Sequence, residues 1–145
     1  MIRQLSALVG LALALAACGE NTNNASLQTP PAAVPQPKAW MLFFETNSTA
    51  LSAQSTNTVV EAAAVAKANP AARVTIIGFT DTEGGSAYNQ ALSVRRANAV
   101  RDALTRNGVA AGSITVSGAG EEQLLVPTAD QVRNPNNRRV QVVVQ

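Results

Sequence analysis

The stretch Val74-Thr-Ile-Ile-Gly-Phe-Thr-Asp-Thr-Glu-Gly84 and the segment that follows it decide the fold of this chain. The β-branched residues at its start predict a buried strand over residues 73–79, which ends at the turn Thr80-Asp81. Residues 86–106 have the apolar spacing of an amphipathic helix, and Asn107-Gly108 after them is a typical C-terminal cap. A strand, a turn and a long helix are therefore the predicted central unit.

Outward from this unit, the sequence predicts three more strands and one more helix. The strands are expected over residues 39–44, 113–117 and 138–144, and the helix from residue 51 or 52 to 68, where Asn69-Pro70 stops it. Gly118-Ala-Gly120 is predicted to be a turn, within a long loop that leads to the last strand. The order β-α-β-α-β-β indicates an α+β, two-layer sandwich with both helices on one face of a small mixed sheet.

The predicted helix 86–106 carries a charge on its apolar stripe. The stripe consists of Tyr88, Leu92, Val100 and Leu104 at helical spacing. The position four residues after Leu92 and four before Val100 is Arg96. Because an unpaired buried guanidinium is costly, Arg96 is expected to meet a carboxylate of the protein or an anionic ligand.

Asp81 is the first candidate for a role beside Arg96. It lies in the turn that leads into the helix, at an edge where open sheets of this kind commonly bind ligands. An acid and a base would then flank one site. A structural ion pair with no ligand explains the same two residues equally well.

The composition excludes several kinds of chemistry. The chain has no histidine and one cysteine, so it cannot form a Ser-His-Asp or Cys-His catalytic set or a histidine-ligated metal site. Asp81-Thr-Glu-Gly84 lacks the series of oxygen ligands of a calcium loop. Glu121 and Glu122 are expected to be solvated charges and not an acid/base pair. The sequence thus predicts no metal, no cofactor and no catalysis.

The N-terminus predicts an export signal. Arg3, an apolar run over residues 5–15 and the small residues before Cys18 have the order of a secretory signal peptide. The ending Leu15-Ala-Ala-Cys18 resembles the lipobox of bacterial lipoproteins, which implies cleavage after residue 17 and lipidation of Cys18. An ordinary signal peptide that contains a cysteine, or a short membrane helix, are the alternatives, although the apolar run is shorter than the about 20 residues that span a bilayer.

Residues 18–38 are predicted to be a flexible tether after the lipidated cysteine. They are rich in Asn, Ala and Pro and lack the apolar surface needed for a core. At roughly 3.3–3.6 Å per residue, such a tether reaches at most about 65–70 Å. The remaining residues, 39–145, have the size of one domain with a modest core.

The balance of charge predicts no polyanionic partner. Without Arg3, ten basic and nine acidic side chains remain, so the net charge is +1. The basic residues are scattered, and only one tryptophan and one tyrosine could stack on bases. Nucleic-acid binding is therefore not expected.

The chain resembles the OmpA-like peptidoglycan-binding domains, which include the peptidoglycan-associated lipoproteins, over about residues 40–145. The matching positions are Val74–Gly84, Tyr88-Asn89, Leu92-Ser93, Arg95-Arg96-Ala97, Val100, Leu104, Gly108, Gly118–Glu121 and Asn137–Val140. The resemblance implies a domain that binds the diaminopimelate of the peptidoglycan stem peptide without a covalent bond. The chain departs from the family's pattern at Phe43–Asn47 and at Glu83. Both departures concern the residues at the rim of the groove.

The resemblance also implies roles for single residues. Asp81 would bind the amino group of the diaminopimelate and Arg96 its carboxylate, while Asn47, Asn89 and Arg138 match further groove positions.

The resemblance and the lipobox together imply a lipoprotein of the outer membrane whose domain faces the periplasm and tethers the membrane to the cell wall. Gly19 favours a location in the outer membrane, because in relatives an aspartate directly after the lipidated cysteine favours retention in the inner membrane. Two alternatives belong to other classes. One is a subunit resembling the Tol-associated lipoprotein, in which wall binding is secondary to docking an envelope protein. The other is a wall enzyme, which the missing histidine and thiol disfavour.

Overall fold

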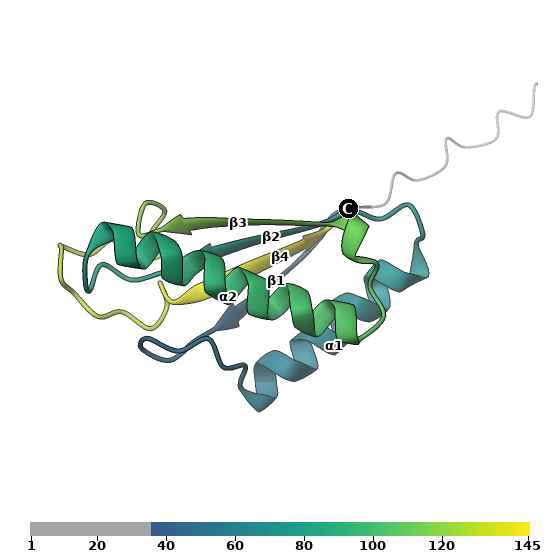
Figure 1. Ribbon diagram of the computed structural model, residues 1–145, viewed down its shortest axis with the longest axis horizontal. Coiled ribbons are helices and arrows are strands. Elements are labelled where there is room, and N and C mark those ends of the chain that lie inside the picture. Colours follow the sequence, from purple (N-terminus) through teal and green to yellow (C-terminus); the bar gives the residue numbers. More distant parts are fainter. Residues whose placement is uncertain (1–35) are drawn as a thin grey trace, which may run out of the picture. The chain divides into compact units, whose positions relative to one another are not determined.

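The computed structural model describes residues 36–145. The predicted signal peptide, the predicted lipidation at Cys18 and most of the predicted tether fall on residues 1–35, which lie outside the described residues. The strands are β1 (Lys38–Phe43), β2 (Val74–Phe79), β3 (Ile114–Gly120) and β4 (Arg139–Val144), and the helices are α1 (Ala53–Ala68), α2 (Ser86–Arg106) and a short 3₁₀ turn, η1 (Ala111–Ser113). Both long helices lie on the same face of the sheet (Figure 1). Neither is long and apolar enough to cross a membrane.

The sheet is mixed, as predicted. Its strand order is β1-β4-β2-β3. The C-terminal strand β4 pairs antiparallel with both β1 and β2, whereas β2 pairs parallel with β3. A parallel pair requires a crossover, and α2 provides it by running back over the sheet. This connection places the turn after β2 and the loop before β4 at the same end of the sheet (Figure 1).

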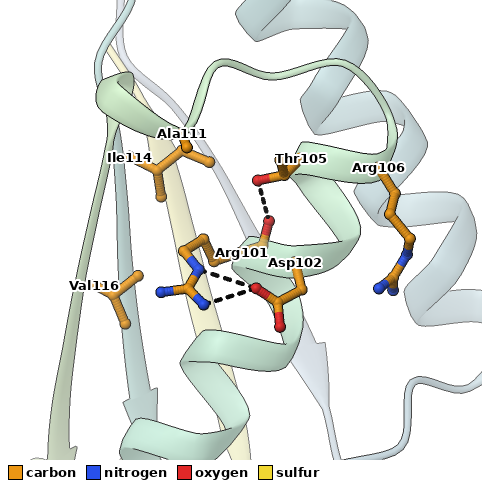
Figure 2. A pocket seen from close by; sticks show the side chains of 7 residues that line it. All are labelled: Arg101, Asp102, Thr105, Arg106, Ala111, Ile114 and Val116. Carbon is orange, nitrogen blue, oxygen red and sulfur yellow. Dashed lines mark hydrogen bonds and ion pairs between the residues drawn. The ribbon is translucent and has the colours of Figure 1, made fainter.

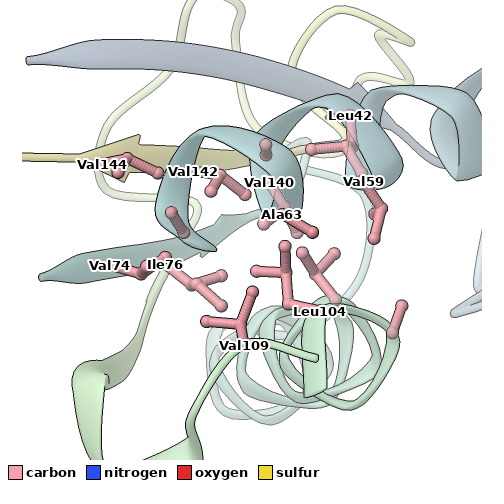
Figure 3. Close-up of a cluster of buried hydrophobic side chains, with 14 of the residues drawn as sticks. Leu42, Val59, Ala63, Val74, Ile76, Leu104, Val109, Val140, Val142 and Val144 are labelled. Atoms are coloured by element: carbon pink, nitrogen blue, oxygen red, sulfur yellow. The ribbon is translucent and has the colours of Figure 1, made fainter. Parts of the chain in front are cut away.

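The core lies between the sheet and the two helices (Figure 3). The alternating residues Val140, Val142 and Val144 of β4 are buried. Opposite them, α1 contributes Val59 and a set of buried alanines, and α2 contributes Ala97, Val100 and Leu104. Small side chains on the helices allow their backbones to approach the sheet closely, so a domain with few aromatic residues still encloses a packed interior.

The helix ends follow the signals in the sequence. The side chain of Ser52 accepts a hydrogen bond from the Ser55 N–H at 3.1 Å and caps the start of α1. α1 ends before Asn69-Pro70. α2 has the predicted bounds, with Asn107 as its C-terminal cap and Gly108 at a φ of 92°.

Three expectations about the fold are corrected. Tyr88 is 47% exposed and lies beneath the guanidinium of Arg95 instead of facing the core. Gly118-Ala-Gly120 is not a turn, because β3 continues to Gly120. Lys38 begins β1 and so belongs to the domain and not to the tether. The first residue of every strand differs from its predicted position by one residue. The last residues of β2 and β4 are as predicted, and that of β1 differs by one residue.

Glycines let α2 lie in contact with β2 and β3. A Cβ atom at Gly78 would come within 1.9 Å of the Ser93 carbonyl oxygen, and one at Gly118 within 2.3 Å of the Ser93 Oγ. The glycines are therefore required where a helix crosses a strand without space for a side chain. This close approach fixes the position of α2 and, with it, that of Arg96.

Gly78→Ala should lower the free energy of unfolding by about 1–3 kcal/mol, because the added methyl overlaps the backbone of α2. Gly112→Ala is the matched control, since nothing lies within 4 Å of a Cβ at that position. Urea unfolding of both variants measures the difference. Equal stability of the Gly78 variant and the wild type would contradict this packing.

Candidate ligand-binding site

Arg96 is completely buried at the end of the sheet where β2 stops. Its guanidinium donates hydrogen bonds to three backbone carbonyl oxygens. The acceptors are Ser48 O from Nε at 2.9 Å, Phe79 O from Nη1 at 3.2 Å and Glu45 O from Nη2 at 2.9 Å. Of the two expected partners, a carboxylate of the protein or an anionic ligand, the first is not found among residues 36–145, and carbonyl dipoles take its place. Arg96 thus holds the segment that follows β1 against β2 and α2.

The environment of Arg96 disfavours its charge, but only in part. The pKa of the Arg96 guanidinium is lowered to about 10, mainly by burial and to a smaller extent by the nearby Arg138, while the Asp81 carboxylate acts in the opposite direction. A pKa of about 10 lies far above neutral pH, so the side chain remains a cation. Of the five N–H groups of an arginine, three are used by the carbonyls and two are left for another acceptor.

Asp81 forms its ion pair with Arg138 and not with Arg96. The Oδ2 atom of Asp81 accepts from Arg138 Nη1 at 3.1 Å and from the backbone N–H of Asn134 at 3.2 Å. The two side chains are 7% and 10% exposed. Within residues 36–145, Oδ1 of Asp81 and Nη2 of Arg138 have no hydrogen-bond partner. The pair therefore retains one acceptor and one donor group for a ligand.

The two arginines are linked through Phe44. The guanidinium of Arg96 lies over the Phe44 ring at 5.4 Å from its centre, and Arg138 Nε donates to the Phe44 carbonyl oxygen at 3.0 Å. One carboxylate and two guanidiniums thus converge where β1, β2 and β4 meet the loops. Such a set suits a small molecule that carries both an ammonium and a carboxylate.

Asn89 and Asn47 have different positions relative to this cluster. Asn89 is buried, and its Nδ2 atom donates to Glu121 Oε2 at 2.6 Å and to the Glu83 carbonyl oxygen at 3.1 Å. It holds the turn after β2, and Glu121 is its partner, which corrects the expectation that Glu121 is only solvated. Asn47 is exposed, in a turn with a φ of 52°. Its turn is the one that Arg96 contacts through Glu45 and Ser48.

Sequence reasoning missed Thr82 as a structural residue of the site. Its hydroxyl donates to the Ala129 carbonyl oxygen at 2.6 Å and accepts from the Val132 N–H at 3.1 Å. Thr82 thereby fixes the loop before β4 to the turn that carries Asp81. A threonine next to an aspartate in a turn has no sequence signal for such a partner, because the two segments are far apart in the chain.

Arg139 was also missed, although it is part of the quoted motif Asn137–Val140. Its guanidinium stacks on the Phe79 ring at 3.9 Å, and Nη2 donates to the Gln123 carbonyl oxygen at 3.0 Å. Burial lowers the pKa of Arg139. Arg139 thus joins the start of the loop before β4, at Gln123, to Phe79 at the end of β2. These contacts lie on the face of the sheet opposite to the helices and Arg96.

A separate hollow of about 680 Å³ lies between α2 and β3 (Figure 2). Its lining residues are Arg101, Asp102, Thr105, Arg106, Ala111, Ile114 and Val116. Arg101 and Asp102 form an ion pair at 2.8 Å, and both are well exposed. An exposed pair of this kind contributes little stability. None of the predicted site residues lines this hollow, so the cluster at Asp81 is the candidate site.

The sequence model described as the OmpA family matches residues 43–138. This range contains Asn47, Asp81, Asn89, Arg96 and Arg138. The chain belongs to the OmpA family. This confirms the family membership that the sequence motifs predicted.

Several curated proteins are similar to the chain over part of their length. An outer membrane protein of Gluconacetobacter diazotrophicus is 35% identical over 113 residues, which cover 74% of this chain and 30% of the relative. The probable lipoprotein YiaD of Escherichia coli is 34% identical over 70% of this chain and 46% of its own length. The peptidoglycan-associated lipoprotein of Pasteurella multocida is 42% identical over 53% of this chain and 51% of its own length. The chain thus spans about half or less of these relatives, and none of the three is named as an enzyme.

The fold is that of solved OmpA-family domains. The crystal structure of the peptidoglycan-associated lipoprotein from Burkholderia pseudomallei superposes with a TM-score of 0.68 at 31% identity. The match covers 72% of this chain and 89% of that structure. The α+β sandwich predicted from the element order is therefore confirmed.

Proposed function

We propose that the domain binds peptidoglycan non-covalently, through the diaminopimelate of the stem peptide. The observation that carries this proposal is the buried Asp81–Arg138 pair beside Arg96, in which one carboxylate oxygen and several guanidinium N–H groups have no partner within the described residues. The name of the relative from Pasteurella multocida, a peptidoglycan-associated lipoprotein, supports the same ligand class. No bond is made or broken.

Diaminopimelate matches this charge arrangement. Its free end carries an ammonium and a carboxylate on one carbon atom. The ammonium would donate to Oδ1 of Asp81, and the carboxylate would accept from the guanidiniums. Hydrogen bonds between charged groups are shorter and roughly twice as strong as neutral ones, and arginine can bind both oxygens of a carboxylate.

Arg138 and Arg96 would share the ligand carboxylate, and because Arg96 is completely buried, its contact requires residues 45–48 to move aside. Arg96 has two N–H groups left after its three carbonyl contacts, whereas Arg138 has an entire Nη2 group without a partner in residues 36–145. Asn47 would contact the ligand from the rim, and Asn89 would position the turn that carries Asp81. Glu83, where the chain departs from the family's pattern, lies in that same turn.

Sedimentation with purified sacculi that contain diaminopimelate tests this function. The protein should pellet with the sacculi and return to the supernatant when free stem peptide is added. A pull-down from periplasmic extract tests the alternative, a Tol-like role in which an envelope protein is the main partner. Capture of such a protein together with a failure to pellet with sacculi would favour the alternative.

We further propose that the protein tethers the outer membrane to the wall. Cys18 would carry the lipid in the outer membrane, the tether up to residue 37 would span the distance, and the domain would face the periplasm. The relatives named as an outer membrane protein and as a lipoprotein support this location. Several acyl chains, at about 0.8 kcal/mol per buried methylene, hold a protein stably on a membrane.

Cys18→Ser should move the protein out of the detergent phase of a Triton X-114 partition, because serine cannot receive the thioether-linked lipid. The binding of the soluble variant to sacculi should stay the same, since Cys18 lies outside the domain. If the serine variant partitions like the wild type, the lipoprotein assignment is wrong.

A further inference from the structure

Gln131 connects the loop before β4 to the turn that carries Asp81. Its side-chain amide forms a reciprocal pair with the backbone of Gly84: Nε2 donates to Gly84 O at 3.0 Å, and Gly84 N donates to Oε1 at 3.1 Å. Its own backbone N–H donates to the Thr82 carbonyl oxygen at 2.9 Å. One residue thus makes three hydrogen bonds to the turn over residues 82–84.

The backbone of Gln131 adopts a conformation that glutamine seldom has. Its φ is 62°, in the left-handed region where a side chain costs free energy and glycine does not. Gln131 is also exposed, so burial of apolar surface does not offset this cost. A strained residue of this kind persists only where other contacts determine its conformation, and such residues concentrate at functional sites.

The same loop segment reaches the carboxylate of Asp81. Three residues after Gln131, the backbone N–H of Asn134 donates to Oδ2 of Asp81. Val132 N–H donates to the Thr82 hydroxyl between these two points. Residues 131–134 therefore run beside residues 81–84, and the direction of the Asp81 carboxylate depends on the register between the two segments.

The ion pair between the same two segments is weaker. Arg133 forms an ion pair with Glu83 at 2.5 Å, but their side chains are 67% and 32% exposed. Solvent and salt screen such a pair. The amide pair of Gln131 is directional and uncharged, so it helps to set the register, together with the Thr82 and Asn134 hydrogen bonds, where the ion pair cannot.

We infer that Gln131 is a positioning residue for the stem-peptide site: it fixes the turn 81–84 so that Oδ1 of Asp81 points toward the ligand ammonium. This inference rests on the proposed function of that site. Without the amide pair, the turn occupies other conformations, and the observed affinity falls with the fraction of molecules that can bind.

Two variants separate the hydrogen bonds from the backbone strain. Gln131→Gly removes the amide pair and relieves the strain at a φ of 62°, whereas Gln131→Met removes the pair and keeps a side chain of similar length. Both should bind sacculi about fivefold more weakly, as expected for the loss of directional hydrogen bonds. Gln123→Ala is the matched control, an exposed glutamine of the same loop whose side chain has no hydrogen-bond partner in residues 36–145.

The measurements use the full chain, purified in detergent. Sacculus sedimentation gives the affinity, thermal unfolding gives the melting temperature, and amide exchange followed by NMR reports the Gly84 N–H. In the Gln131→Gly variant the melting temperature should change by less than about 3 °C, because relief of strain offsets the lost bonds. The Gly84 N–H should exchange faster, while core amides such as that of Ile76 remain protected.

The outcomes distinguish this inference from the proposed function. If the wild type itself does not pellet with sacculi, the proposed function fails and the inference fails with it. If the wild type binds and both Gln131 variants bind equally well despite faster Gly84 exchange, only the positioning role is wrong. If affinity and melting temperature fall together, Gln131 is structural and the inference is also overturned.

Discussion

Asp81→Ala should abolish most binding to sacculi. In the proposed complex the ligand ammonium leaves water and meets the Asp81 carboxylate, so removal of that carboxylate leaves a desolvated cation without a partner. A loss of this kind costs roughly 2–5 kcal/mol, or 30-fold or more in affinity. No other carboxylate hydrogen-bonds to Arg138 within residues 36–145, so the structure offers no replacement for Asp81.

Asp81→Asn is the sharper form of this experiment. The asparagine Oδ1 can still accept from Arg138 Nη1 and the Asn134 N–H, so the contacts that hold the loop persist in large part. The negative charge is lost. We therefore expect a well-folded variant that binds poorly. Sacculus sedimentation and thermal unfolding on the same samples check both statements. An Asp81→Asn protein that unfolds early but binds normally while folded would indicate a purely structural ion pair.

Arg96→Leu should have the largest effect on stability. Leucine removes the guanidinium donor from three carbonyl oxygens, the buried one of Phe79 and the partly buried ones of Ser48 and Glu45. A buried acceptor without a partner costs about 1–3 kcal/mol, and a lost hydrogen bond from a charged donor about 1.5–3 kcal/mol, so loss of the three contacts should lower the free energy of unfolding by about 3–5 kcal/mol. This is a large fraction of the stability of a small domain. Urea unfolding measures it.

Arg96→Lys separates the two roles of this side chain. Lysine keeps the positive charge, but its single nitrogen atom cannot reach three carbonyls on separate segments or bind a carboxylate with a planar fork. We expect intermediate stability and weaker binding by the folded protein. Arg95→Lys, at the exposed neighbouring position beside Tyr88, is the matched control and should change neither. Wild-type binding by folded Arg96→Lys would remove Arg96 from the ligand site.

The sequence was sufficient for the order of elements and the bounds of α2, because strong local signals act there. Asn107-Gly108 caps the helix, and the β-branched residues before Gly78 define β2. Gly118-Ala-Gly120 was misread because glycine serves two purposes. It is common in turns, but here it allows α2 to contact β3, and that need arises only from tertiary packing.

Helical spacing correctly predicted that Arg96 is buried, but it could not identify the partner. The acceptors lie 17 to 51 residues away, in loops whose conformation depends on the folded state. The same is true of Asp81 and Arg138, which are 57 residues apart in the chain. Tyr88 was misplaced for a related reason. It shares the apolar spacing, but it lies in the first turn of α2 and remains exposed there.

The most direct test of the account is a calorimetric titration of the protein with three soluble stem peptides. One carries diaminopimelate with a free carboxylate, one carries the amidated form, and one carries lysine in its place. We expect the tightest binding to the first peptide, weaker binding to the other two, and loss of most of this discrimination in Arg96→Lys. Equal affinity for all three peptides would contradict recognition of the diaminopimelate end by Asp81 and the two arginines.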